Sequence, residues 1–139
     1  MSLTTKTVSF SLSDKIAIVT GGAQGIGKAI AEKLSAHGAR VVIADLSGQR
    51  AASVAKKIDG VGVKCDVTKE KQIKTLVSEV KKTFGTIDIF VSNAGVHFGE
   101  KNHAASTSNK LWNESWDVNV MAHVYAARAT LPEMIEKQK

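Results

Sequence analysis

Three glycines recur at short spacing near the start of the chain, in the segment TGGAQGIG that begins at Thr20. Gly21, Gly25 and Gly27 follow a β-rich run and precede a segment with helical periodicity. Glycine tolerates the positive φ of a tight turn, and its missing side chain lets a pyrophosphate approach the backbone. Free amide hydrogens and the helix dipole then stabilise the anion. The spacing G-x-x-x-G-x-G differs from the common G-x-G-x-x-G, but a strand before it and a helix after it favour dinucleotide binding over an empty turn.

An acidic residue, Asp45, ends the next β-rich run, 18 residues after Gly27. In this position a carboxylate can accept hydrogen bonds from both hydroxyls of an adenosine ribose. A 2′-phosphate would meet like-charge repulsion there, so Asp45 predicts NAD rather than NADP as the cofactor. The alternative interpretation is a strand-ending acid that starts a turn or caps the following helix.

The elements that must position these residues alternate between short β-rich runs and amphipathic helical segments, which is typical of a parallel sheet. We expect strands over residues 15–20, 40–45, 61–66 and 87–93. We expect helices over 26–37, from an N-cap at Ser47, from an N-cap at Thr68 to Gly85, and within 109–137, where a break near Asp117 could divide the last one.

Right-handed crossovers order these strands 3-2-1-4, with helices on both faces. The predicted fold class is therefore α/β, a Rossmann-type doubly wound parallel sheet of four strands. The strand order reverses between the first and fourth strands, so their carboxyl ends should mark the binding crevice. The glycine segment and Asp45 both lie at this edge of the predicted sheet.

Length and composition fit one domain: an N-terminal tail over 1–14 and a dinucleotide-binding domain over 15–139. The sequence has no apolar run long enough to span a bilayer and no signal-peptide pattern at its start, so a cytoplasmic location is expected. One cysteine and four irregularly spaced histidines predict no metal site. The net charge of +6 comes from lysines interleaved with acids, which indicates a solvated surface rather than a nucleic-acid or membrane interface.

Several segments together resemble the short-chain dehydrogenase/reductase family. TGGAQGIG resembles its cofactor loop TGxxxGIG, and SNAG at 92–95 resembles its NNAG motif with Ser92 in place of the first Asn. CDVT at 65–68 resembles its adenine-side DVT segment, WDVNV at 116–120 resembles the segment that carries its catalytic Asn, and LPEM at 131–134 resembles its helix-ending LPxM. The resemblance runs from about Leu12 to the last residues.

The resemblance implies further contacts with NAD. Gln24 is neutral where relatives that use NADP often have a basic residue. Asp66 would bond the adenine amino group, Val67 would border the ring, and Ile26 would lie on the nicotinamide side. Backbone at 93–95 would lie beside the adenosine ribose. The cofactor-binding candidates are thus Gly21, Gln24, Gly25, Ile26, Gly27, Asp45, Asp66, Val67, Asn93, Ala94 and Gly95.

The resemblance also implies an NAD-dependent oxidoreductase that interconverts a secondary alcohol and a ketone by hydride transfer. The family uses Asn, Ser, Tyr and Lys, the last two as Y-x-x-x-K, and here only Asn119 has a matching position. Tyr125 is followed by Ala129 instead of Lys, which favours a core or interface role. We therefore expect a cofactor-binding portion that ends before the Ser, Tyr and Lys, inactive by itself and part of a longer enzyme.

Two other functions stay open: a catalytically inactive NAD-binding module, and a helix-mediated assembly protein that has lost the ligand. The last helix has a wide apolar stripe that another surface must cover. The stripe is made of Trp112, Trp116, Val120, Val124, Leu131 and Ile135, and is widened by Met121 and Tyr125. In the resembled family this helix packs against a partner subunit, which implies a homodimer or homotetramer. Further residues of the same chain could instead cover the stripe.

Overall fold

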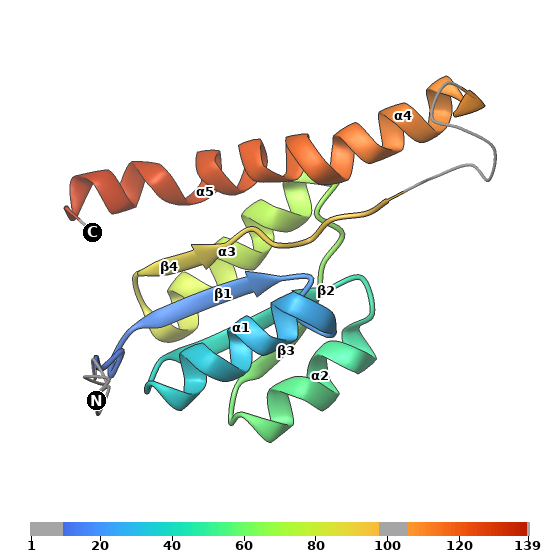
Figure 1. Ribbon diagram of the computed structural model, residues 1–139. Helices are drawn as coiled ribbons and strands as arrows, with labels where there is room; N and C mark the ends of the chain where they lie inside the picture. Colours follow the sequence, from blue (N-terminus) through green and yellow to red (C-terminus); the bar gives the residue numbers. More distant parts are fainter. Residues whose placement is uncertain (1–9, 98–105, 139) are drawn as a thin grey trace, which may run out of the picture.

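The computed structural model describes residues 10–97 and 106–138 and shows a four-stranded parallel sheet with helices on both faces (Figure 1). The strands are β1 (Ile16–Thr20), β2 (Arg40–Asp45), β3 (Val61–Lys64) and β4 (Ile89–Val91). Their order is β3-β2-β1-β4, and all three pairs are parallel. The predicted fold class and strand order are confirmed.

The two central strands are buried on both faces, as expected for a parallel sheet between helical layers. Alternate side chains of β1 enter different cores: Ile16 and Ile18 face one side, Ala17 and Val19 the other. On the first side the sheet packs against α3 (Glu70–Phe84) and α5 (Ala122–Glu136); on the second it packs against α1 (Gly25–Ala36) and α2 (Gly48–Lys57). The layers hold the carboxyl ends of the strands at one edge.

Helix ends follow the sequence in most places. Gly38 after α1 and Gly85 after α3 have positive φ, of 96° and 101°. The Ser47 side chain caps α2 by accepting a hydrogen bond from the Arg50 amide at 3.3 Å.

The expected cap at Thr68 is wrong. α3 begins at Glu70, and the N-cap residue is Lys69, whose side chain makes no cap hydrogen bond. Asp66 Oδ1 accepts hydrogen bonds from both the amide and the hydroxyl of Thr68, at 3.0 and 2.7 Å. This local turn uses the Thr68 hydroxyl as a donor, and Thr68 lies one residue before the N-cap position.

The last helical segment is continuous but changes its winding. α4 (Asn109–Trp116) runs into a π-helical turn (Asp117–Met121) and then into α5. The break expected near Asp117 is thus a wider turn rather than an interruption, and Figure 1 shows one long rod across the top of the sheet. Pro132 lies inside α5, and the helix ends at Glu136, within the range 109–137 expected from the sequence. Tyr125 packs against the core on the α3 side, which agrees with a core role.

Glu133 attaches the end of α5 to the body of the domain. Its carboxylate lies 2.5 Å from Lys81 Nζ on α3 and 2.8 Å from Lys137 Nζ, and it accepts a 3.0 Å hydrogen bond from the Thr86 hydroxyl. These hydrogen bonds, first from Lys137, then from Lys81 and Thr86, lower the pKa of Glu133 to about 2. The cluster therefore favours the ionised form in the folded state.

We expect Glu133→Gln to lower the melting temperature near neutral pH and to have little effect near pH 2. A pKa lowered on folding means that the stabilisation is fully present above the unfolded-state value of 4.5 and is lost as pH falls toward 2. Thermal unfolding followed by circular dichroism at several pH values measures this. Glu79→Gln, which neutralises an exposed glutamate on α3, is the control; an equal pH-dependent shift in that variant would contradict the role of Glu133.

Candidate cofactor site

The glycine segment forms a tight turn at the carboxyl end of β1. Gly21 and Gly25 have φ values of 64° and 54°, a region that side chains rarely adopt. A Cβ atom on Gly27 would lie 2.4 Å from the Gly21 carbonyl oxygen and 2.4 Å from Asn93 Nδ2. The first two glycines thus supply the turn, and the third permits the close approach of α1 to β1.

Thr20 and Asn93 join this turn to the end of β4. The Asn93 side-chain amide donates to the carbonyl oxygens of Thr20 and Gly21, at 3.0 and 3.4 Å. The Thr20 hydroxyl accepts hydrogen bonds from the backbone amides of Asn93 and Ala94, at 3.0 and 3.2 Å. These contacts fix the two strand ends that border the crevice. Thr20 was not among the sequence candidates, although its place at the end of an apolar strand beside a glycine turn could have indicated it.

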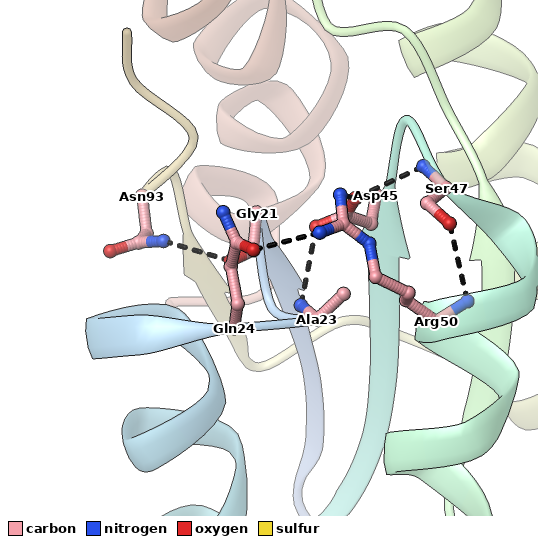
Figure 2. A network of polar contacts seen from close by, with 7 residues as sticks. All are labelled: Gly21, Ala23, Gln24, Asp45, Ser47, Arg50 and Asn93. Carbon is pink, nitrogen blue, oxygen red and sulfur yellow. Dashed lines mark hydrogen bonds and ion pairs between the residues drawn. The ribbon is translucent and has the colours of Figure 1, made fainter. Parts of the chain in front are cut away.

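Asp45 is 8% exposed and points across the end of the sheet toward the glycine turn. Its Oδ2 accepts a hydrogen bond from the Ala23 amide at 3.2 Å, and its Oδ1 accepts one from the Ser47 amide at 3.0 Å (Figure 2). The two backbone donors fix the carboxylate at the crevice. Asp45 therefore holds the backbone of both the glycine turn and the start of α2, and it also brings a negative charge to the pocket.

Arg50, in the first turn of α2, lies beside Asp45 and was missed by the sequence analysis. Its Nη1 donates to Gln24 Oε1 at 2.8 Å, and its Nη2 lies 3.9 Å from Asp45 Oδ1. Figure 2 shows the guanidinium group between these two side chains. The signal in the sequence was the Ser47 cap, which places residue 50 in the helical turn nearest the crevice.

A pocket of about 760 Å³ lies at this edge of the sheet. All eleven predicted cofactor-binding residues line it, together with Leu46, Arg50, Cys65, Thr68, Lys69, Val96, Glu114, Asp117 and Val118. The glycine turn, the ends of β2, β3 and β4, and the last helical rod each contribute. The sequence candidates are therefore brought together in one cavity, of the size typical of small-molecule sites.

Cys65 lines the same pocket but is 2% exposed. Burial, with a smaller contribution from the charge of Asp66, raises the pKa of its thiol to about 11. The sulfur is therefore a neutral thiol at physiological pH, and its role is packing rather than nucleophilic chemistry.

Asn119 does not line the pocket. Its side chain lies in the π-helical turn and pairs with one residue after β4: Oδ1 accepts from the Val96 amide at 2.9 Å, and Nδ2 donates to the Val96 carbonyl at 2.8 Å. Val96 itself borders the pocket. One turn further on, His123 Nδ1 lies 2.6 Å from the Ser92 hydroxyl. Asn119 thus joins the last helix to the loop that lines the crevice.

Within residues 10–97 and 106–138, no three His, Cys, Asp or Glu side chains come together as a metal site. The helices in these same ranges include none that is both long and apolar enough to cross a bilayer.

The family profile and a solved structure point to the same family as the sequence motifs. The profile of the short chain dehydrogenase family matches residues 15–139. A mitochondrial borneol dehydrogenase of Lavandula x intermedia is 37% identical over 91% of this chain and 50% of its own length. A short chain aldehyde dehydrogenase of Euphorbia lathyris is 36% identical over 88% of this chain and 45% of its own length.

Among solved structures, a short chain dehydrogenase/reductase from Burkholderia phymatum in complex with NAD superposes with a TM-score of 0.87. It is 28% identical, and the match covers 94% of this chain and 47% of that one. The chain thus spans about half the length of the relatives that it matches. With its fold, its glycine turn and the family match over residues 15–139, the chain belongs to the short-chain dehydrogenase/reductase family.

Proposed function

We propose that this chain is the cofactor-binding portion of an NAD-dependent oxidoreductase that interconverts a secondary alcohol and a ketone. The observation that carries the proposal is the meeting of the glycine turn and Asp45 at one pocket, at the carboxyl ends of β1 and β2. Backbone amides and a helix N-terminus suit a diphosphate, and a fixed carboxylate beside them suits the hydroxyls of a ribose.

The residues present fit NAD on three counts. The turn carries no side chain at Gly21, Gly25 or Gly27, so backbone amides can reach a pyrophosphate. Asp45 is already oriented by two backbone donors and needs no rearrangement to accept ribose hydroxyls. Two exposed apolar side chains, Leu46 and Ile26, line the pocket and offer surfaces for the adenine and the nicotinamide rings.

In the proposed reaction NAD accepts or donates the hydride. The residues of this chain would orient it: Asp45 grips the adenosine ribose, and the backbone at Asn93–Gly95 lies along the same ribose. Asp66 and Val67 would contact the adenine. Asn119, held on Val96, would support the proton transfer that accompanies hydride transfer. The choice of a secondary alcohol is supported by the name of one relative, a borneol dehydrogenase, since borneol is a secondary alcohol.

Isothermal titration of the full protein with NAD tests the cofactor step. We expect saturable binding with one NAD per chain. A matched titration with nicotinamide mononucleotide, which lacks the AMP half, should give much weaker binding because Asp45 would have no adenosine ribose to contact. Failure of NAD to bind would contradict the proposal and favour an assembly protein. Because this portion should not oxidise an alcohol by itself, a Y-x-x-x-K pair encoded in the gene beyond Lys139 is what would separate a longer enzyme from a catalytically inactive module.

We also propose a cytoplasmic homodimer or homotetramer in which the last helix packs against a second copy. Trp112, Trp116 and Ile135 are exposed on α4 and α5, which leaves large apolar side chains in solvent. Light scattering should give a mass of two or four chains, and Trp112→Glu with Trp116→Glu should reduce it to one. Phe10→Glu, at an exposed apolar residue away from this helix, is the control. A monomeric unmodified protein would contradict this assembly.

A further inference from the structure

Arg50 places a cation beside Asp45, the carboxylate that should select the cofactor. Its guanidinium group lies between Gln24 of the glycine turn and Asp45 at the end of β2 (Figure 2). All three side chains line the same pocket. The adenosine end of the crevice therefore carries a positive as well as a negative charge.

We propose that Arg50 is a specificity-determining residue, whose guanidinium group binds the 2′-phosphate of NADP. Arg50 therefore reduces the preference for NAD over NADP that Asp45 creates. The inference rests on the proposed dinucleotide site and concerns only the 2′-position of the adenosine ribose. It predicts that the protein binds NADP measurably, although more weakly than NAD.

The first support is the freedom of the Arg50 side chain. Its backbone is fixed, because its amide donates to the Ser47 hydroxyl in the cap of α2. The side chain itself is 57% exposed and is held by one hydrogen bond to a neutral amide and by an ion pair of 3.9 Å. Because Arg50 is largely in solvent and lies 3.9 Å from the carboxylate, this ion pair is weaker than one made through direct hydrogen bonds. The guanidinium group can therefore exchange these partners for a ligand at little cost.

The second support is the geometry of the donor. A guanidinium group presents several N–H donors in a planar fork that matches two oxygens of a phosphate. Only one such donor is directed at Gln24, and the contact with Asp45 is too long for a hydrogen bond. Arg50 thus has donor capacity for an anion next to the ribose site.

The third support is the balance of charge. Asp45 alone would repel a 2′-phosphate, which carries more than one negative charge at neutral pH. Arg50 offsets that repulsion from the adjoining helix turn. Asp45 and Arg50 therefore act in opposite directions on the same ligand group, and the ratio of NAD to NADP affinity depends on both.

A purely structural role is the alternative. Arg50 could hold the glycine turn against β2 by joining Gln24 to Asp45. In that case its removal would loosen the whole crevice and weaken NAD and NADP equally. The two roles are therefore separated by the ratio of the two affinities, not by either affinity alone.

The experiment compares Arg50→Gln and Arg50→Lys with the unmodified full protein, by isothermal titration with NAD and NADP. AMP and adenosine 2′,5′-bisphosphate, which differ only in the 2′-phosphate, repeat the comparison on the adenosine half. Lys28→Gln is the matched control, since it removes one positive charge from α1, where Lys28 pairs with Glu32 and does not line the pocket. Circular dichroism checks that each variant is folded.

We expect Arg50→Gln to weaken NADP and adenosine 2′,5′-bisphosphate by about tenfold, the loss of one charge-assisted hydrogen bond, and to change NAD and AMP by less than about threefold. Arg50→Lys should fall between, because it keeps the charge but not the fork. An unchanged ratio, or an equal change in Lys28→Gln, would overturn the role of Arg50 while leaving NAD binding intact. If the unmodified protein does not bind NAD, both the dinucleotide site and this role of Arg50 are overturned.

Discussion

Replacement of Asp45 by alanine is expected to weaken NAD binding by about a hundredfold or more and to bring the affinities for NAD and NADP together. Two hydrogen bonds donated by ribose hydroxyls to a charged acceptor contribute about 1.5–3 kcal/mol each, and every 1.4 kcal/mol is a factor of ten. NADP has only the 3′-hydroxyl left for such a contact, so it loses less, and it is freed from the repulsion of the carboxylate. Isothermal titration with both dinucleotides measures the effect.

The alanine variant also removes a structural acceptor. Asp45 receives hydrogen bonds from the amides of Ala23 and Ser47, so its loss leaves two donors without their partner. Each such donor costs about 1–3 kcal/mol when buried. Asp45→Asn is the control for this, because one side-chain oxygen remains as an acceptor while the charge is gone. If Asp45→Asn still discriminates against NADP as strongly as the unmodified protein, the carboxylate charge is not what selects NAD.

Combining the change with Arg50→Gln completes the test. If the two charges oppose one another at the 2′-position, Asp45→Asn in the presence of Arg50 should improve NADP binding, and the double variant should lose that gain. Because the side chains are in contact, the two effects should not add, and the size of the coupling measures how directly they act on the same group. Additive effects would mean that each side chain acts on the ligand independently of the other.

Elements with a strong local pattern could be predicted from the sequence. β2 has the same bounds in the sequence prediction and in the structure, because a continuous apolar run between Gly38 and the Asp45–Ser47 turn leaves little choice. β4 is shorter than expected: Asp88 accepts a hydrogen bond from the Ile16 amide through its side chain, and the Asn93 side chain turns back to the Thr20 carbonyl. The pattern thus shows where a strand lies, while side-chain hydrogen bonds determine where it ends.

The position of the pocket could be predicted from the strand order more than from any single motif. Gly21, Asp45, Asp66 and Asn93 each come at the end of a predicted strand, and parallel strands bring those ends to one edge. What the sequence could not provide was the direction of long side chains. Arg50 turns toward Asp45 and lines the pocket, whereas Asn119 pairs with Val96 and is not among the lining residues. Asn119 and Val96 lie more than twenty positions apart, as do Arg50 and Gln24. The direction of Arg50 also depends on the Ser47 cap of α2.

Gly27→Ala should unfold part of the crevice, although the same exchange stabilises most helices. Inside a helix, alanine is favoured over glycine by about 0.8–1.0 kcal/mol. Here the new Cβ would lie 2.4 Å from both the Gly21 carbonyl oxygen and Asn93 Nδ2, so the helix must move away from β1 and β4. Overpacking of this kind costs about 1–3 kcal/mol, which exceeds the gain in propensity. We expect a lower melting temperature and no measurable NAD binding.

Gly25→Ala is the matched variant two residues earlier, and it separates packing from ligand contact. Nothing lies within 4 Å of a Cβ at Gly25, but the residue lines the pocket and has a φ of 54°. The strain costs about 1–2 kcal/mol, so the fold should survive with a modest loss of stability. The methyl group would stand where the diphosphate must approach, and NAD binding should fall well beyond what that strain explains. If Gly27→Ala melts at the same temperature as the unmodified protein, the close approach of α1 to the glycine turn is not needed for the fold. If Gly25→Ala binds NAD normally, the glycine turn does not hold the pyrophosphate in the way that its geometry indicates.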